Sequence, residues 1–228
     1  MIILLIIIFC FFVFLYNLYY ISHDDFEIVR KDISIEKILT FAFLTGFVSL
    51  FFSRLFFAIF NPLPQVTNPL GFLAVTYYPG YSLSGAVLGA SLFIYIYARA
   101  NKLPIGKMLD LFTFSFLAAL PLGFLIFFIF FWGKTSVVFN SLFFLSVVIS
   151  LIFLKIIYRF SEKGEIKNGS FGLIFLSIFN LSYFVIKLFS DIRSFSFFDF
   201  ENIILFILIF SSLILLVNLE IMDKFLEK

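Results

Sequence analysis

Hydrophobic residues in this chain fall into long blocks, several of which reach about the 20 residues that an α-helix needs to cross a bilayer. The segments between the blocks hold most of the charged residues and the prolines. The pattern predicts seven spanning helices over residues 1–20, 39–60, 82–97, 111–132, 137–157, 171–189 and 203–217. The expected fold class is therefore an all-α integral membrane protein, with residues 1–228 forming a single polytopic membrane domain.

The composition agrees with this pattern. Hydrophobic residues make up 63% of the chain and charged residues only 13%, against about one quarter charged in soluble domains, so a soluble fold is excluded. The 40 Phe residues are interpreted as lipid-facing side chains. Cys10 is the only cysteine and His23 the only histidine, which leaves no intramolecular disulfide and no Cys/His pair for zinc or iron. We expect no cofactor and no metal.

The positions of Lys and Arg set the expected orientation. Twelve of the 16 lie in the first, third and fifth connections and at the C-terminus, three lie in or beside the other connections, and Arg54 lies within the second helix. The positive-inside rule places the first group in the cytoplasm, so the N-terminus is expected outside and the C-terminus inside. The first helix is kept as a span because no Lys or Arg precedes it and its end, residues 19–23, lacks a small-residue cleavage site.

Arg54 is the most informative single residue, because an ionisable group within a span costs several kcal/mol unless it pairs or faces water. It lies about six residues, roughly 9 Å, from the outer end of its helix. The guanidinium could form a functional site or snorkel to an outer lipid phosphate, which it can bind through two parallel hydrogen bonds. The alternative is a structural Arg paired within the bundle to a carbonyl or to a hydroxyl such as that of Ser84.

The connection over residues 61–80 follows Arg54 and carries four prolines and no charge. Its apolar residues predict a segment that lies along the outer interface, or else a proline-stiffened tether.

Small residues in the third and fourth helices indicate close helix packing. Gly85 and Gly89 form a GxxxG pair, a common pattern whose simplest meaning is contact between two helices. Gly123 follows Pro121, which is expected to kink the fourth helix in mid-span. Asp110 is interpreted as the N-terminal cap of that same helix.

The order of these segments resembles the family of bacterial prolipoprotein diacylglyceryl transferases, over about residues 40–215. The similarity rests on Gly46 to Phe57 with its Arg, on the Gly-rich motif from Gly80 to Gly89, on the basic loop from Tyr97 to Pro104 followed by Asp110-Leu111, and on the basic segment from Lys155 to Lys167 followed by Phe171-Gly172-Leu173. The resemblance implies seven helices with the N-terminus outside, in the bacterial plasma (inner) membrane. It also implies transfer of diacylglyceryl from phosphatidylglycerol to a lipobox cysteine, with a prolipoprotein signal peptide as the protein partner.

The departures from the family fall where its chemistry takes place. Ser84 stands where the family has a His, and Phe124 and Phe127 stand where it has an Arg and an Asn. In the sixth helix, the segment from Tyr183 to Ser190, with Lys187, represents the family's Arg- and Glu-containing run. A Phe cannot supply the charge stabilisation of an Arg, and a Ser cannot replace a His as a base near neutral pH.

Three hypotheses remain open. The first is a diverged, transferase-like pseudoenzyme that binds phospholipid, with weak, altered or absent transfer. The second is an authentic transferase in which Arg54, Lys134 and Lys187 replace the lost cations. The third is a non-enzymatic accessory subunit that contacts partner helices through Gly85 and Gly89. The lipid-binding candidates are Arg54, Ser84, Lys134 and Lys187, the packing candidates are Gly85, Gly89 and Gly123, and no nucleic-acid partner is expected.

The charge asymmetry yields a direct test of orientation. Reporter fusions after Gly133 are expected to read external and fusions after Lys163 cytoplasmic, because the flanking Lys and Arg favour the cytoplasmic side. The opposite pattern at either site would overturn the orientation.

Overall fold

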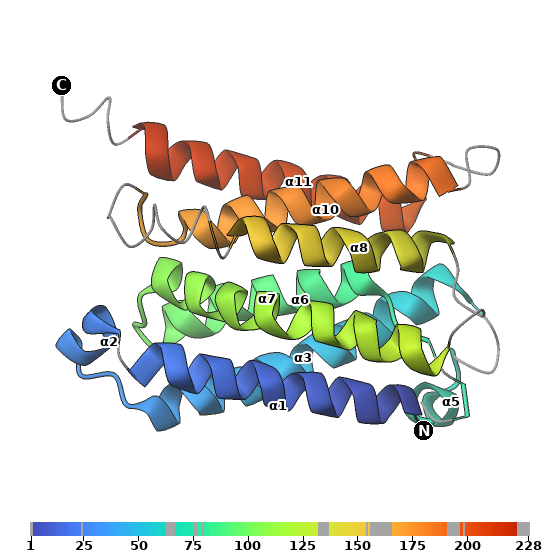
Figure 1. Ribbon diagram of the computed structural model, residues 1–228, viewed down its shortest axis with the longest axis horizontal. Helices are drawn as coiled ribbons and strands as arrows, with labels where there is room; N and C mark the ends of the chain where they lie inside the picture. The colour runs from blue at the N-terminus through green and yellow to red at the C-terminus, as the bar shows by residue number, and fades with distance from the viewer. Residues whose placement is uncertain are drawn as a thin grey trace.

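The regular structure of the chain consists of helices that lie side by side along one axis (Figure 1). The computed structural model describes residues 2–23, 25–62, 67–74, 77–78, 80–131, 137–153, 155, 166–190, 197 and 199–222. The elements are α1 (Ile2–His23), α2 (Phe26–Arg30), α3 (Ile35–Phe60), α5 (Pro69–Leu73), α6 (Leu83–Ala100), α7 (Ile105–Phe130), α8 (Val137–Ile152), α10 (Ser170–Ser190), α11 (Phe200–Val217) and a π-helical turn, η2 (Asn218–Met222).

The fold class is confirmed as all-α with several helices suited to a membrane. In the part of the chain that the structure describes, α1, α3, α6, α7, α10 and α11 are each long and apolar enough to cross a bilayer. The predicted fifth span corresponds to α8, which is apolar but has only 16 residues. Large apolar side chains are exposed along all these helices, a pattern that fits contact with lipid.

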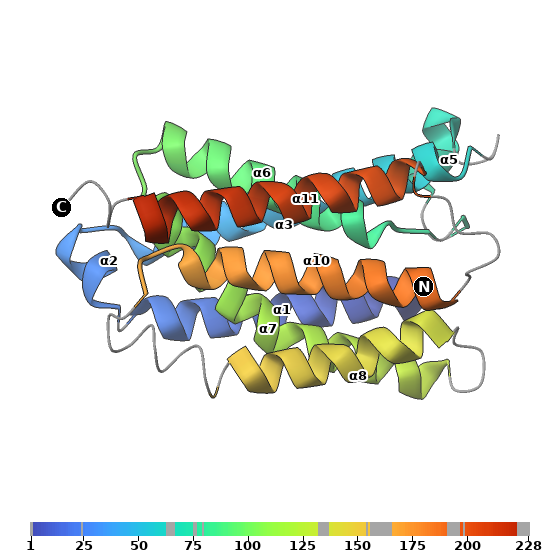
Figure 2. The same cartoon turned by 90° about the horizontal axis from the view of Figure 1, so that it is seen from above.

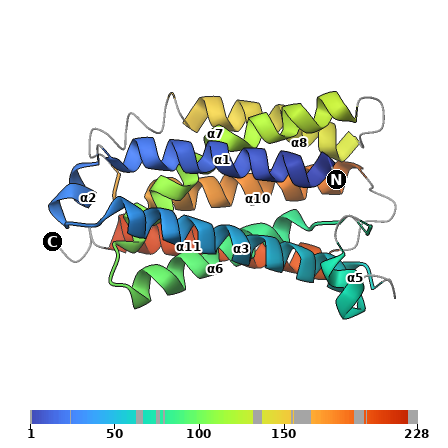
Figure 3. The same ribbon diagram turned by 90° about the horizontal axis from the view of Figure 1, so that it is seen from below.

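Successive long helices run in opposite directions, so the chain has two distinct ends. The N-terminus and α5 lie at one end, here named the α5 end, and α2 lies at the other, the α2 end (Figures 1 and 3). The most extensive helix contacts are between α3 and α6, between α1 and α7, and between α10 and α11. Seen from above, α10 and α11 lie over the other helices, and α8 lies beside α10 (Figure 2).

Phenylalanine forms much of the buried core, so the interpretation of this residue as lipid-facing is wrong for many positions. Phe41 stacks on Tyr97 with ring centroids 4.4 Å apart, and Phe114 stacks on Phe171 at 3.9 Å. Phe153 meets the edge of Phe171. Flat rings can fill the space between helices through stacked and edge-to-face contacts, so abundance alone does not tell a core Phe from a surface Phe.

Asp110 does not cap its own helix, contrary to the sequence prediction. The helix α7 begins at Ile105, after Pro104, which places Asp110 in its second turn. The buried Asp110 carboxylate accepts hydrogen bonds from the backbone N–H groups of Gly169 at 2.7 Å and Gly172 at 2.8 Å. It therefore caps α10, whose first N–H groups have no partner within their own helix.

The N-terminus of α10 has a second carboxylate partner and a close backbone contact. Glu220, in η2, accepts a hydrogen bond from the N–H of Lys167 at 2.9 Å and one from the Ser170 hydroxyl. A Cβ atom at Gly106 would lie 2.3 Å from the carbonyl oxygen of Asn168, so only glycine lets α7 approach this turn. The start of α10 is thus fixed by α7 and by the end of α11.

The three predicted packing glycines lie at close helix contacts. A Cβ atom at Gly85 would stand 2.7 Å from Cβ of Phe56, and one at Gly89 would stand 2.5 Å from Cβ of Phe52. Both contacts bring α6 against α3. A Cβ atom at Gly123 would lie 2.8 Å from Sγ of Cys10, at the contact of α7 with α1.

We expect Gly85→Leu and Gly89→Leu each to lower the free energy of unfolding by about 2 kcal/mol or more, because the new side chain must push α3 away. Thermal unfolding of the purified protein in detergent measures the effect. Leu92→Phe is the matched control, since it adds bulk to the same helix at a side chain that is 47% exposed. Unchanged stability in both glycine variants would contradict close packing of α6 on α3.

Candidate functional site

Arg54 is buried in α3 and binds backbone carbonyl oxygens. Its side chain is 3% exposed. Nε donates to the carbonyl of Phe72 at 3.1 Å, one terminal nitrogen donates to Gly71 at 3.1 Å, and the other donates to Gly80 at 2.9 Å. The Arg54 guanidinium thus holds α5, and the chain that enters α6, against the C-terminal part of α3.

The contacts of Arg54 favour the structural interpretation over a snorkelling one. It forms no ion pair with any residue that the structure describes, and the ring of Phe57 lies under its guanidinium at 5.7 Å. The hydroxyl of Ser84 is not its partner. Burial raises the pKa of the neighbouring Tyr81 phenol above its usual range, although the Arg54 charge opposes this shift, so Tyr81 is neutral near pH 7. Phosphate binding by Arg54 stays a prediction.

Three serines beside Arg54 join α3 to α6. Ser53 donates its hydroxyl to the carbonyl of Ser82 at 2.8 Å, and the Ser82 N–H donates to the carbonyl of Ser53 at 3.0 Å. The Ser82 hydroxyl accepts from the N–H of Gly85 at 3.2 Å and so caps α6. It also lies 2.9 Å from the hydroxyl of Ser84, which continues the polar contacts into the bundle.

Ser84 leads to a polar group that we name the Glu201 cluster, consisting of Ser84, Tyr183, Lys187 and Glu201. Oε1 of Glu201 accepts from the Tyr183 hydroxyl at 2.9 Å and from the Ser84 hydroxyl at 3.4 Å. Oε2 accepts from Nζ of Lys187 at 2.6 Å, in an ion pair. The cluster therefore connects α6, α10 and α11 at the α5 end of the bundle.

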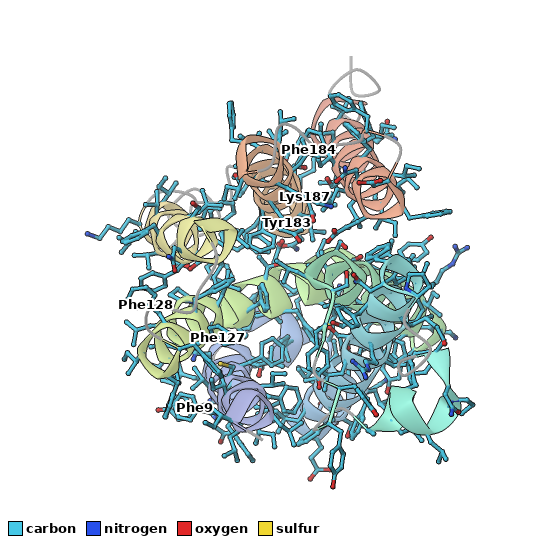
Figure 4. The ribbon with its side chains drawn as sticks, turned by 90° about the vertical axis from the view of Figure 1, so that its right-hand side faces the viewer. Phe9, Phe127, Phe128, Tyr183, Phe184 and Lys187 are labelled. Atoms are coloured by element: carbon cyan, nitrogen blue, oxygen red, sulfur yellow. The ribbon has the colours of Figure 1, made fainter. Side chains whose placement is uncertain are left out.

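Local structure explains how these residues meet. Tyr183 and Lys187 are four residues apart, so they share one face of α10. Figure 4 shows Tyr183 below α10, toward the other helices, and Lys187 between α10 and α11. Glu201 lies in the first turn of α11, where the helix dipole favours a negative charge. Because α10 and α11 are antiparallel neighbours, the end of one helix and the start of the other bring these residues together.

The charged members of the cluster are only partly shielded. The side chains of Lys187 and Glu201 are 26% and 19% exposed, whereas Ser84 is completely buried. The cluster can therefore present a paired positive and negative charge to a polar ligand at the surface. It does not expose a serine nucleophile. Among the described residues no group of His, Cys, Asp or Glu is arranged to hold a metal ion.

The structure brings together some of the predicted site residues and separates others. Ser84 and Lys187 meet at Glu201, and Arg54 adjoins them through Ser53 and Ser82. In contrast, Phe127 stacks on Phe131 at 4.4 Å and lies with α7, on the other side of the view from Lys187 (Figure 4). Phe124 belongs to the same apolar part of α7. Lys134 lies outside the described residues.

Two members of the cluster were not identified from the sequence. Glu201 lies just before the predicted span 203–217, where charged residues are common, and Tyr183 is one of ten Tyr residues. The available signal was the four-residue spacing of Tyr183 and Lys187, which places two polar groups on one face of an otherwise apolar helix. A carboxylate at the start of the next helix was the natural partner for that face.

The comparisons with known proteins identify no relative: no family model, no curated protein and no solved structure matches the chain.

The carbonyl contacts of Arg54 predict a local effect of its replacement. Arg54→Gln is expected to lower the free energy of unfolding by about 3 kcal/mol, since hydrogen bonds to a charged group contribute about 1.5–3 kcal/mol each. It is also expected to speed hydrogen exchange in peptides covering α5. Arg54→Lys should be intermediate, because a point charge cannot span three carbonyls. Thermal unfolding and exchange mass spectrometry measure these effects.

Arg99→Gln is the control for Arg54, because Arg99 is exposed at the α2 end and contacts Tyr95 of its own helix. Retained anionic lipid is measured on the same samples. If Arg54→Gln loses bound anionic lipid without loosening α5, the headgroup interpretation replaces the structural one.

Proposed function

We propose that this chain is a multi-pass protein of the bacterial plasma membrane that binds phospholipid at the Glu201 cluster and is a diverged relative of the prolipoprotein diacylglyceryl transferases. One observation carries the proposal. Ser84 and Lys187, about one hundred residues apart, stand at positions matched to polar residues of that family, and the fold brings them to the same carboxylate. The resemblance predicts that these two positions belong to one site.

The surroundings of the cluster suit a phospholipid. A charged pair lies at the ends of α10 and α11, and beside it both helices expose large apolar side chains, among them Phe189 at 70% and Ile207 at 55%. A phospholipid has the matching division into a charged headgroup and apolar tails. Headgroup contact at Lys187 and Glu201 would leave the acyl chains along the exposed faces of these helices.

The distribution of charge in the fold supports an external position for this site. The α2 end carries Arg30, Lys31, Arg99, Lys102 and Lys107, and the positive-inside rule places such an end in the cytoplasm. The proposed orientation then has the N-terminus outside and seven spans, with α8 as the fifth. The α5 end and the Glu201 cluster would face the outer leaflet.

The same geometry argues against efficient transfer of diacylglyceryl to a thiol. That reaction needs cationic groups around the phosphate and a base for the thiol. Lys187 is already paired with Glu201, and Arg54 is committed to backbone carbonyls. Ser84 is no base near neutral pH, and Phe127 contributes only an aromatic ring. We therefore propose a pseudoenzyme that retains lipid binding and not turnover.

We expect the purified protein to retain phospholipid through delipidation but not to transfer diacylglyceryl from phosphatidylglycerol to a lipobox peptide. Native mass spectrometry measures the retained lipid. The mass of the peptide, after incubation with phosphatidylglycerol carrying deuterated acyl chains, measures transfer. A catalytically active transferase assayed in parallel is the positive control.

Robust transfer would contradict the pseudoenzyme proposal, and Lys134 and Lys187 would then be the first residues to replace. Complete loss of phospholipid under conditions in which the bundle stays folded would contradict lipid binding.

A further inference from the structure

The charges of the Glu201 cluster bear on which class of phospholipid headgroup it binds. We infer that the cluster selects a lipid whose headgroup is a zwitterion of the phosphoethanolamine type, with the ammonium at Glu201 and the phosphate at Lys187. The inference rests on the proposed function, since it names the class of lipid that the same site binds.

Charge balance at the cluster favours a zwitterionic headgroup. Within the four residues of the cluster, Lys187 carries the one positive charge and Glu201 the one negative charge, and the two form an ion pair, so the cluster is dipolar. A headgroup that carries only a phosphate charge would share the Lys187 ammonium with Glu201 and bring a second anion next to the carboxylate. Two anions beside one cation are costly where water is partly excluded. A zwitterionic headgroup brings one positive and one negative charge, so its ammonium can contact Glu201 while its phosphate contacts Lys187.

The hydrogen-bonding capacity of Glu201 leaves room for an ammonium donor. An ionised carboxylate offers about four acceptor positions. Tyr183, Lys187 and Ser84 use three of them in the structure. The fourth can accept an N–H from a primary ammonium while the three protein contacts stay in place. The Tyr183 and Ser84 hydroxyls also fix the orientation of the carboxylate, which reduces the cost of ordering it on binding.

The acceptor that the cluster offers favours ethanolamine over choline. A quaternary ammonium has no N–H to donate, and proteins usually hold it over the faces of several aromatic rings. Tyr183 uses its hydroxyl, and the acceptor on offer is a carboxylate oxygen. A primary ammonium is therefore the better match. Arg54 does not shift the preference toward anionic lipid, because it is 3% exposed and held by three carbonyls.

The test is a competition among lipids that differ only in headgroup. The full-length protein in detergent is exchanged against an excess of an equimolar mixture of dioleoyl phosphatidylethanolamine, phosphatidylglycerol and phosphatidylcholine, and bound lipid is counted by native mass spectrometry. We expect phosphatidylethanolamine to be retained about fivefold over each of the others, a preference equivalent to about 1 kcal/mol. Equal retention, or preference for phosphatidylglycerol, overturns the inference while leaving phospholipid binding intact.

Variants of the Glu201 cluster test whether it causes the preference for phosphatidylethanolamine. Glu201→Gln keeps the shape and an acceptor for Tyr183 but removes the charge, and it is expected to bring the ratio of ethanolamine to glycerol lipid close to one. The Lys187→Gln/Glu201→Gln double variant avoids an unpaired charge, so it should stay folded and show the same loss of preference. Lys31→Gln, which breaks an exposed pair with Glu27 at the α2 end, is the matched control. A preference that survives in the double variant overturns the assignment to this cluster.

Two further results are informative. If the wild-type protein retains none of the three lipids, the proposed function itself fails. Water-soluble glycerophosphoethanolamine is added as a competitor, and we expect it to displace the lipid only at a large excess because it lacks acyl chains. Displacement at equal concentration would assign the site to a soluble zwitterion and overturn its assignment to a lipid.

Discussion

Buried backbone carbonyls without helical partners require donors, and at the α5 end Arg54 supplies them. A cation within an apolar bundle is tolerated only where acceptors surround it, and the carbonyls of Gly71, Phe72 and Gly80 are such acceptors. The carbonyls therefore stabilise the buried guanidinium, and the guanidinium supplies the donors that the carbonyls need. The position of α5, the entry into α6 and the serine contacts that lead to Glu201 all depend on this arrangement, because they follow directly from where the chain is held against α3.

At the α2 end, the backbone groups that need partners are N–H donors, and the side chain that binds them is an anion. The N–H groups at the start of α10 need acceptors, and the Asp110 carboxylate receives two of them. An anion is favoured at a helix N-terminus by the dipole as well as by the hydrogen bonds. A cation thus binds carbonyls at one end of the bundle and an anion binds amides at the other. Both side chains are charged, yet their partners are backbone atoms.

Sequence reasoning identified the helices well, because hydrophobic blocks of spanning length leave little choice of structure. It also selected Arg54, Gly85 and Gly89, whose residue types are unusual at their positions. It failed where the partner was distant in sequence. Asp110 looked like a local cap because capping preferences are local, whereas its partners lie about sixty residues away. Glu201 was missed for the same reason: its meaning depends on Tyr183 and Lys187, which only the folded bundle brings together.

The contact of Glu220 with the start of α10 has a consequence for biogenesis. The N–H of Lys167 and the hydroxyl of Ser170 contact a carboxylate of η2, which follows α11. During synthesis, α10 is therefore made before the group that completes its N-terminus. Asp110, made earlier, is already present to receive the first amides. The contact between Glu220 and the start of α10 forms only after α11 has folded back along α10 to the same end of the bundle, so these two helices complete their assembly as a pair.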